Sequence, residues 1–479
     1  IWVGTATEGL DAFNPGAVNF THLRNDPDRE QSIAPGIVWG IYEDKSDALW
    51  IATDVGSAGS YLTQFDINTG KTTRYKHDPD DRSTLLPGTF RAFADDLDED
   101  SGFWVGGSVG LNNLNRITGK SVYYRQPQHD ENLGRNNIFA LLPTAEDHRI
   151  LWVGSVGGLD RFNTRTHTFE HVFLTADTTD QEPPTLSLVQ DADHMLWAGT
   201  NNGLFRINPN GEATLASSYN PRDTTTINDN QIMSLLVRSE EPGIVWLAMQ
   251  NGGLNRYDSK TGKTLHYMTK DGLPSNTLYG LLEDNSGTLW MSTNNGISNF
   301  DPATKTFRNY GLDDGLMALE YDQNAYFKGK NGVLYFGSGK GVTAFVPEQL
   351  HINEIPPQVV ISDFKLFNHS VPVAPNSVLT KPLNKTKKIT LKYTQNEVSF
   401  NFVALHFANA DKNTYAYQLV GFDKNWINAG TQRSATYTNL PPSNYTFRVK
   451  AANADGIWNE QGASIQLSIL PPWYQTWWA

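Results

Sequence analysis

The sequence predicts an all-β protein: a seven-bladed β-propeller followed by a β-sandwich of immunoglobulin or fibronectin type III character. A short Trp-containing element recurs at intervals of 44 to 54 residues through the first 350 of the 479 residues. The chain has 40 Gly and 24 Pro and no long run of helical periodicity, a pattern typical of many short strands joined by turns. From Val359 onward the strands continue but the Trp repeat stops.

Each repeat contains an apolar-Trp-apolar strand, a Gly turn and a second short strand, as in LWVGSVGGLDRFN at Leu151. Another strand precedes this element and another follows it, and four short strands per repeat form the blade of a propeller. A Trp at the same place in every blade is expected to fill the core between blades rather than to stack on sugars. The marker aromatics are Trp2, Trp50, Trp104, Trp152, Trp197, Trp246, Trp290 and Tyr335.

The order of the strands predicts how the ring closes. If the strands of a blade are lettered A to D from the centre outward, the chain from Val18 runs D, A, B, C seven times. Residues 18–23 are therefore predicted to pair with residues 341–346, which protects both exposed edges. Residues 17–350 form the propeller in this interpretation, and residues 1–16 are the remnant of a preceding repeat or propeller. A ring of eight blades is the alternative count.

Residues 356–471 are predicted to form the sandwich. Its expected strands include VVISDFKLF at Val359 and YTFRVKAAN at Tyr445. Tyr445 follows a Pro-Pro turn at the start of a strand, where a tyrosine corner would lie. Residues 472–479 are part of the terminal PPWYQTWWA, whose aromatics resemble the belt beside a membrane span, so we expect a juxtamembrane segment there.

Composition excludes several classes of function. The 38 Lys and Arg against 51 Asp and Glu give a net charge of −13, which disfavours binding to nucleic acid. The chain has no Cys, so it has no thiol nucleophile and no Cys-ligated metal. The turn DDLDEDSG at Asp95 has the alternating carboxylates of a calcium loop but lacks its Gly and its final Glu, so a solvated hairpin is expected. No cofactor and no metal are expected.

The repeats and the C-terminal domain together resemble the periplasmic sensor region of the two-component regulator propeller (Reg_prop) family, in which such blades precede a Y_Y_Y sandwich. The resemblance implies a non-enzymatic sensor in the periplasm, often for carbohydrate, on an inner-membrane protein. It also implies a transmembrane helix and a cytoplasmic output, either a histidine kinase, often hybrid, or a diguanylate cyclase. The matching sandwich residues are Tyr415, Tyr417, Gly421, Phe422, Trp426, Tyr437, Leu440, Pro441, Pro442, Tyr445, Phe447, Val449, Ala451, Asn453, Gly456 and Trp458.

The long connections from D to A strands are the expected binding site, because such loops on a rigid scaffold commonly carry binding groups. Their amide and guanidinium groups suit the hydroxyl and carboxylate groups of an oligosaccharide or another small molecule. Turn formation is the competing explanation for the three asparagines, which directly precede A strands. The candidate ligand-binding residues are Asn136, Asn230, Asn276, Arg135, Arg24 and Arg29.

Two other functions stay open. One is a protein-interaction scaffold, and the other is a propeller glycosidase or lyase, although no Ser-His-Asp set, HExxH or phosphate-binding Gly loop is present. Because a propeller is stiff, a signal is expected to change how domains are arranged. We therefore expect a homodimer in the membrane, formed through the sandwich and the transmembrane helix.

Overall fold

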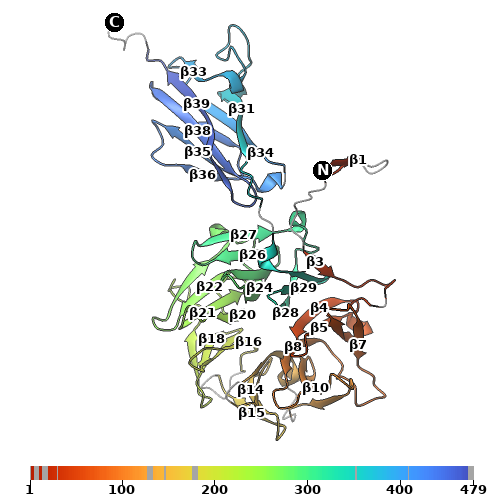
Figure 1. The fold of residues 1–479 in the computed structure, drawn as a ribbon. Helices are drawn as coiled ribbons and strands as arrows, with labels where there is room; N and C mark the ends of the chain where they lie inside the picture. The colour runs from red at the N-terminus through yellow and green to blue at the C-terminus, as the bar shows by residue number, and fades with distance from the viewer. Residues whose placement is uncertain are drawn as a thin grey trace. The chain divides into compact units, whose positions relative to one another are not determined.

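The computed structural model describes residues 2–4, 10–12, 20–29, 31–126, 133–144, 147–174, 182–350, 353–407 and 409–472. The chain divides into two compact units, residues 19–350 and residues 1–18 with 351–479, each treated by itself below (Figure 1). In the second unit, β1 (Trp2–Gly4) and β2 (Leu10–Ala12) form an antiparallel hairpin. The rest of the proposed remnant, and residues 473–479 of the expected juxtamembrane segment, lie outside the described residues.

The described part of the first unit forms seven four-stranded antiparallel sheets, so the propeller has seven blades (Figure 1). The innermost strands are β4 (Ile37–Glu43), β8 (Phe90–Asp95), β12 (Ile138–Pro143), β16 (Thr185–Gln190), β20 (Ile232–Val237), β24 (Leu278–Glu283) and β28 (Tyr321–Lys328). The second strands are β5 (Ala48–Asp54), β9 (Phe103–Gly107), β13 (Ile150–Ser155), β17 (Leu196–Thr200), β21 (Ile244–Met249), β25 (Leu289–Thr293) and β29 (Leu334–Ser338).

The outer half of each blade completes the D, A, B, C order of the chain. The third strands are β6 (Ser60–Asp66), β10 (Gly110–Leu114), β14 (Gly158–Asn163), β18 (Gly203–Ile207), β22 (Leu254–Asp258), β26 (Gly296–Asp301) and β30 (Gly341–Phe345). The outermost strands are β7 (Thr72–Lys76), β11 (Ser121–Tyr124), β15 (Thr168–Val172), β19 (Ala213–Ser217), β23 (Lys263–Tyr267), β27 (Thr306–Tyr310) and β3 (Thr21–Leu23).

The ring closes through a strand from the start of the propeller. In β3, Thr21 pairs with Ala344, and Leu23 pairs with Val342 of β30. The predicted closure is confirmed over these residues, whereas residues 18 and 19 lie outside the described part. Because the last blade takes its outermost strand from the beginning of the chain, β4 and β28 become neighbours and the seven innermost strands surround one channel.

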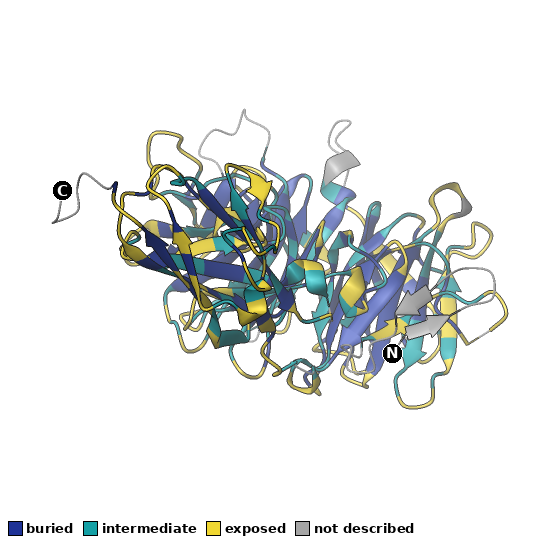
Figure 2. Ribbon diagram, turned by 90° about the horizontal axis from the view of Figure 1, so that it is seen from above, coloured by how far each residue is buried: buried dark blue, intermediate teal, exposed yellow. Residues whose placement is uncertain are grey.

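The marker tryptophans are core residues, as predicted. From Trp50 to Trp290 each is at most 5% exposed. Buried residues concentrate in the strands, and exposed residues concentrate in the turns (Figure 2). A Trp from one blade contacts aromatic rings of the next, as in the 4.9 Å stacking of Trp50 on Phe103. These contacts bury apolar surface between neighbouring blades, which is the main favourable contribution to the ring.

A carboxylate in the A-to-B turn holds the indole N–H of the marker Trp. The Nε1 of Trp290 donates to Asp284 at 2.8 Å, and the same carboxylate accepts the backbone N–H groups of Ser286 and Thr288 at 2.9 Å each. Asp44 and Asp191 hold the indoles of their own blades in the same way, also at 2.8 Å. One carboxylate therefore orders the turn and satisfies the buried indole together.

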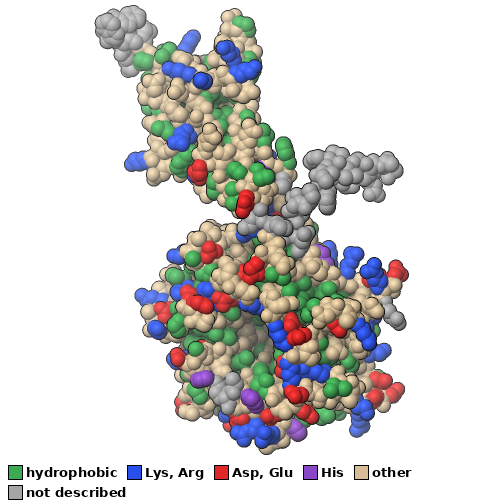
Figure 3. All heavy atoms as spheres, in the orientation of Figure 1, with side chains coloured by type: hydrophobic (Ala, Val, Ile, Leu, Met, Phe, Trp, Pro, Cys, Tyr) green, Lys and Arg blue, Asp and Glu red, His purple; other side chains and the backbone are tan. Residues whose placement is uncertain are grey.

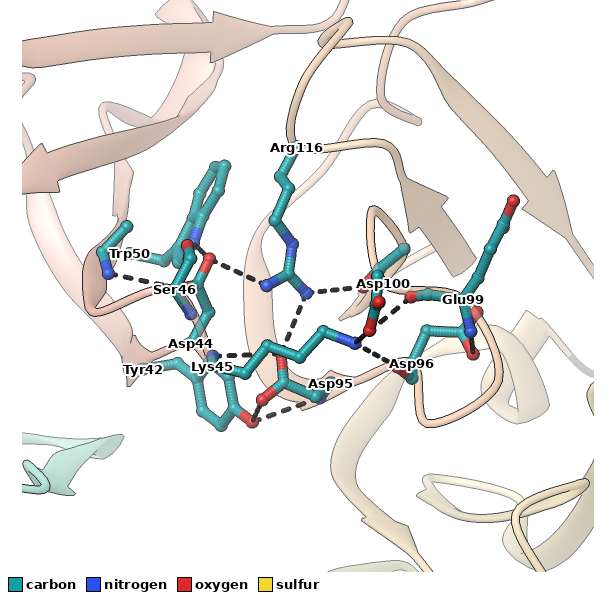
Figure 4. Close-up of polar contacts among 12 residues, drawn as sticks. Tyr42, Asp44, Lys45, Ser46, Trp50, Asp95, Asp96, Glu99, Asp100 and Arg116 are labelled. Atoms are coloured by element: carbon teal, nitrogen blue, oxygen red, sulfur yellow. Dashed lines mark hydrogen bonds and ion pairs between the residues drawn. The ribbon is translucent and has the colours of Figure 1, made fainter.

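Ion pairs connect neighbouring blades beside these turns. Arg116 of the second blade lies 3.3 Å from Asp44 of the first and 2.9 Å from Asp95 of its own blade (Figure 4). Its side chain is 6% exposed and that of Asp44 is fully buried, so the pair is shielded from water. Removing one partner would leave an unpaired buried charge, which is strongly destabilising.

In the second unit, the strands that the structure describes form a sandwich of two sheets. One sheet has the order β32 (His369–Ser370), β31 (Gln358–Leu366), β34 (Val398–Leu405) and β37 (Ser434–Tyr437). The other has the order β33 (Lys388–Leu391), β39 (Trp458–Ile469), β38 (Asn444–Ala452), β35 (Thr414–Val420) and β36 (Ile427–Gly430). The Tyr445 hydroxyl donates to the Pro441 carbonyl at 2.7 Å, which confirms the tyrosine corner.

The remaining regular elements are single 3₁₀ turns in the connections. They are η1 (Gly56–Ala58), η2 (Leu133–Asn136), η3 (Thr269–Asp271), η4 (Leu312–Asp314), η5 (Pro347–Gln349), η6 (Leu383–Lys385) and η7 (Ala410–Lys412). Within the described residues, none of the helices has the length and apolar character needed to span a membrane.

We expect the Asp284→Ala variant to lower the free energy of unfolding by about 2–4 kcal/mol, because buried donors of the turn and of Trp290 lose their acceptor. Burial raises the pKa of Asp284, but hydrogen bonds from Thr288, Trp290 and Ser286 outweigh it and lower the pKa overall. The contribution is therefore present above the unfolded pKa of about 4 and is lost as the pH falls through the lower folded value. Denaturant unfolding at pH 7 and at low pH measures both effects.

Asp301→Ala is the matched control, since Asp301 orders the C-to-D turn of the same blade but lies at the surface. It should cost much less stability. Equal losses in the two variants would contradict the proposed role of the buried carboxylate.

Candidate functional site

Each innermost strand departs from regular pairing near the end where the D-to-A connection enters. In β4, for example, the register jumps from Val38 to Gly40, so Trp39 is left out of the ladder. The residues left out in this way are Trp39, Arg91, Phe139, Leu186, Met233 and Tyr279, and in the seventh blade a longer segment after Tyr321. We call these residues the bulge ring. Such bulges re-aim side chains and are frequent beside functional sites.

In the first six blades a small residue follows the bulge, because the innermost strands are crowded. A Cβ added to Gly40 would lie 2.5 Å from the ring of Phe93, and one added to Gly280 would lie 2.5 Å from Tyr326. The strands therefore approach closely below the bulge ring, and the large side chains gather at its level.

Three neighbouring blades meet at Arg91. Its guanidinium lies 5.0 Å from the ring of Trp39 and 5.1 Å from that of Phe139, within the range of cation–π attraction. Its Nη1 donates to Asn137 at 2.9 Å, whereas its buried Nε has no partner among the described residues. Burial lowers the pKa of Arg91, and Asp54 opposes this shift.

The seventh blade reaches across the channel. The Tyr326 hydroxyl donates to Ser234 of the fifth blade at 2.9 Å, and the amide of Asn324 donates to the Phe139 carbonyl of the third. Asn324 has a φ of 64°, a left-handed conformation that Asn tolerates better than most residues. Within the described residues, the buried Gln323 Nε2 and Asn324 Oδ1 have no partner. Such atoms are ready to bind water or the polar groups of a ligand.

Two acidic residues, Glu320 and Asp322, lie next to Gln323 and Asn324 in the chain. Burial, with a further contribution from Glu320, raises the pKa of Asp322 to about 6. Burial also raises the pKa of the Tyr279 hydroxyl, with smaller contributions from Asp322 and Glu320. The bulge ring thus combines aromatic faces, one half-buried cation and a carboxyl group whose pKa is raised by burial.

The three candidate asparagines close their loops. The side-chain oxygens of Asn136, Asn230 and Asn276 accept the first backbone N–H groups of the D-to-A connections, at 3.0, 2.7 and 2.9 Å. These contacts are the turn formation named above as the competing explanation. Their Nδ2 groups remain the part that could donate to a ligand, and that role stays a prediction.

The candidate arginines lie in different surroundings. Arg29 is 82% exposed and pairs with Asp26 at 3.5 Å within its own loop. Arg24 is exposed just after β3. Arg135 packs over Gly157, where an added Cβ would lie 2.1 Å from its Cγ. The contacts given for Arg29 and Arg135 are thus with their own or an adjacent turn.

Sequence reasoning missed the bulge ring, although the sequence contains a signal for it. In every innermost strand a larger residue directly precedes a small one, as in Trp39-Gly40, Arg91-Ala92 and Tyr279-Gly280. The larger residue varies from blade to blade whereas the small one is fixed by crowding. Variation at a structurally constant position would have indicated a site.

We expect the Asp322→Asn variant to be more stable than the wild type at pH 7.5. The raised folded pKa means that the charged carboxylate costs stability above about pH 6, and that this cost disappears as the pH falls toward the unfolded value of about 4. Thermal unfolding of both proteins across this range measures the difference. Asp313→Asn, an exposed neighbour in the preceding loop, is the control and should show no such pH-dependent gain. A gain from Asp322→Asn that is constant from pH 4 to 7.5 would contradict the assignment.

The chain matches known families in both units. Residues 406–470 match the family described as Y_Y_Y domain, and residues 272–295 match the Two component regulator propeller. The chain is 28% identical over 495 aligned residues to histidine kinase P4 of Formosa agariphila. That match includes 98% of this chain and 34% of the relative, so the chain spans about a third of the relative's length.

A solved structure has a similar fold. It is an extracellular domain assigned to a hybrid two component system of B. thetaiotaomicron, with a TM-score of 0.70 and 23% identity. The similarity covers 98% of this chain and 60% of that one. The family matches therefore fall on one blade and on the sandwich described above: a two component regulator propeller repeat lies in the sixth blade, and a Y_Y_Y domain lies in the sandwich.

Proposed function

We propose that this chain is the ligand-sensing region of a transmembrane two-component signalling protein and lies on the periplasmic side of the inner membrane. The observation that supports this most is the match of 98% of the chain to a protein named histidine kinase, of which the chain spans only a third. The propeller would bind the signal, and the sandwich would pass it to a cytoplasmic output. The chain itself would carry out no catalysis.

The bulge ring and the D-to-A loops form the proposed ligand site. Trp39, Phe139 and Tyr279 offer aromatic faces, on which the C–H faces of sugar rings pack well. Arg91 and the unpartnered amide of Gln323 offer donors for hydroxyl groups. This combination favours a carbohydrate, either neutral or mildly anionic.

Binding of an oligosaccharide panel, measured by calorimetry, tests this site. We expect Arg91→Met to weaken binding at least tenfold, because the ligand would lose the donors of a half-buried guanidinium. Asn230→Asp keeps an oxygen that can close the loop and replaces the amide donor with a charged oxygen, so it tests the donor role of that asparagine apart from its turn role.

Lys260→Ala is the matched control, since Lys260 is an exposed cation in a C-to-D turn, outside both the bulge ring and the D-to-A loops. It should leave affinity unchanged. Binding that survives Arg91→Met and Asn230→Asp together would reject the site, and failure of every oligosaccharide to bind would reject the carbohydrate preference.

We also propose that the full-length protein is a homodimer in the membrane, with the sandwich near the two-fold axis. In this region the side-chain oxygen of Asn459 accepts the backbone N–H groups of Gln461 and Gly462 at 3.1 Å, so replacing Asn459 would disturb the turn. The neighbouring Gln461 is exposed, so it is the better position for a cysteine cross-linking probe. The chain contains no Cys, so Gln461→Cys introduces a single thiol into this region.

In membranes holding the full-length protein, Gln461→Cys should cross-link between protomers with a yield that changes when ligand is added. Thr166→Cys, on an exposed turn of the propeller, is the comparison. Cross-linking through Thr166→Cys but not through Gln461→Cys would show that the axis passes through the propeller.

A further inference from the structure

Residues of the second and third blades line an open hollow of about 520 Å³. It lies at the end of the blades where the A-to-B and C-to-D turns are. This end is opposite to the bulge ring along each strand. Trp104 and Tyr124 line the hollow together with polar side chains of both blades, among them Asp96, Asn113 and Arg165. The volume lies within the range of small-molecule sites.

Trp104 and Trp152 differ from the marker tryptophans Trp50, Trp197, Trp246 and Trp290, whose indoles donate to a carboxylate of their own A-to-B turn. Trp104 is only 2% exposed, and the described carboxylate at the start of its turn, Asp96, has other donors. The turn before Trp104, residues 96–102, is longer than the corresponding turns at 191–195 and 284–288. Asp96 occupies the place of Asp191 and Asp284, but its carboxylate accepts the backbone N–H groups of Asp98 and Glu99 and the amide of Asn113 instead.

The residue paired with Trp104 on the neighbouring strand also does not cover the face of its indole ring. In three later blades the residue opposite the marker Trp is an Arg whose guanidinium lies over the indole, at 5.6 to 5.8 Å. Opposite Trp104 stands Asn113, which is shorter and is held at 2.8 Å by Asp96. A buried indole that does not donate to the carboxylate at the start of its turn therefore forms part of the wall of an open hollow.

The long turn is held firmly from the first blade. The ammonium group of Lys45 donates to the backbone carbonyls of Asp96 and Glu99 at 3.1 and 3.4 Å, and to the Asp100 carboxylate at 2.9 Å (Figure 4). A site that is ordered before binding loses less conformational entropy when a ligand binds.

The charges around the hollow are mixed. Asp96, Asp98 and Glu99 contribute carboxylates, and Lys120 and Arg165 contribute cations, with Arg165 3.5 Å from Asp98. Acidic and basic side chains are likewise intermingled on the propeller face seen in Figure 3. A polyanion would be repelled by the three carboxylates, whereas hydroxyl groups can both donate to them and accept from the cations.

We propose that this hollow is a second binding site, specific for a neutral saccharide of one or two sugar units. The Trp104 N–H donates to a sugar oxygen, the Asp96 and Asn113 side chains bind hydroxyl groups, and the ring of His167, which lies against Tyr124 with centroids 4.7 Å apart, packs on the sugar. The proposal goes beyond the sensing site at the bulge ring and does not depend on it.

The test is a titration of the chain with maltose, cellobiose, lactose and sucrose, followed by saturation-transfer NMR and calorimetry. We expect at least one disaccharide to bind, and Trp104→Phe, which keeps the ring but removes the donor, to weaken that binding at least fivefold. Thr118→Arg fills the hollow from an exposed turn and should abolish binding without disturbing the core.

Gln64→Ala is the matched control, because Gln64 stands opposite Trp50 as Asn113 stands opposite Trp104. It should leave binding unchanged. If no disaccharide binds, or if binding survives both Trp104→Phe and Thr118→Arg, the proposal is wrong. Binding that is lost only in Asn230→Asp would reject the second site while supporting the bulge ring.

Discussion

Closure of the ring is the constraint on which the rest of the propeller depends. The pairing of β3 with β30 makes the first and last blades neighbours, so each blade can bury both of its faces. It also forces seven innermost strands around one narrow channel. The small residues after the bulges of the first six blades, such as Gly40 and Gly280, follow from that crowding. The bulges then place their larger side chains together at one end of the channel.

The carboxylate of the A-to-B turn provides a hydrogen-bond acceptor for the buried Trp of the repeat. A marker Trp fills the space between blades, but its N–H would be costly to bury without an acceptor. Asp44, Asp191 and Asp284 supply that acceptor six residues before the Trp, and the turn length fixes this spacing. In the longer turn before Trp246, Glu241 supplies the acceptor instead, whereas in the turn before Trp104 the carboxylate of Asp96 binds other donors. Trp104 shows that a small change in a connection can convert a structural residue into a candidate binding residue.

Much of the fold could be predicted from the sequence because the same pattern of residues recurs in every blade. Eight marker aromatics and a consistent strand order gave the blades, their number and the closing strand. The short edge strands β32 and β36 of the sandwich were missed because they have no repeat and few apolar residues. The loop asparagines were found, but whether a side chain closes a turn or faces a ligand depends on contacts that spacing does not contain. The pairing of Asp96 with Asn113 is likewise set by turn length, not by residue type.

The two candidate sites share a physical origin in departures from the repeat. Seven equal blades offer seven equal positions, and a small asymmetric ligand cannot use them equally. Specific binding therefore requires that some blades differ from the others. The seventh blade differs by a long bulge that carries Asn324 and Tyr326 across the channel, and the second differs by a long turn beside Trp104. Since the other blades keep the shared contacts, the ring remains stiff while these two change. A stiff ring with local exceptions can bind a ligand without deforming, which is the basis of the expectation that a signal changes how whole domains are arranged.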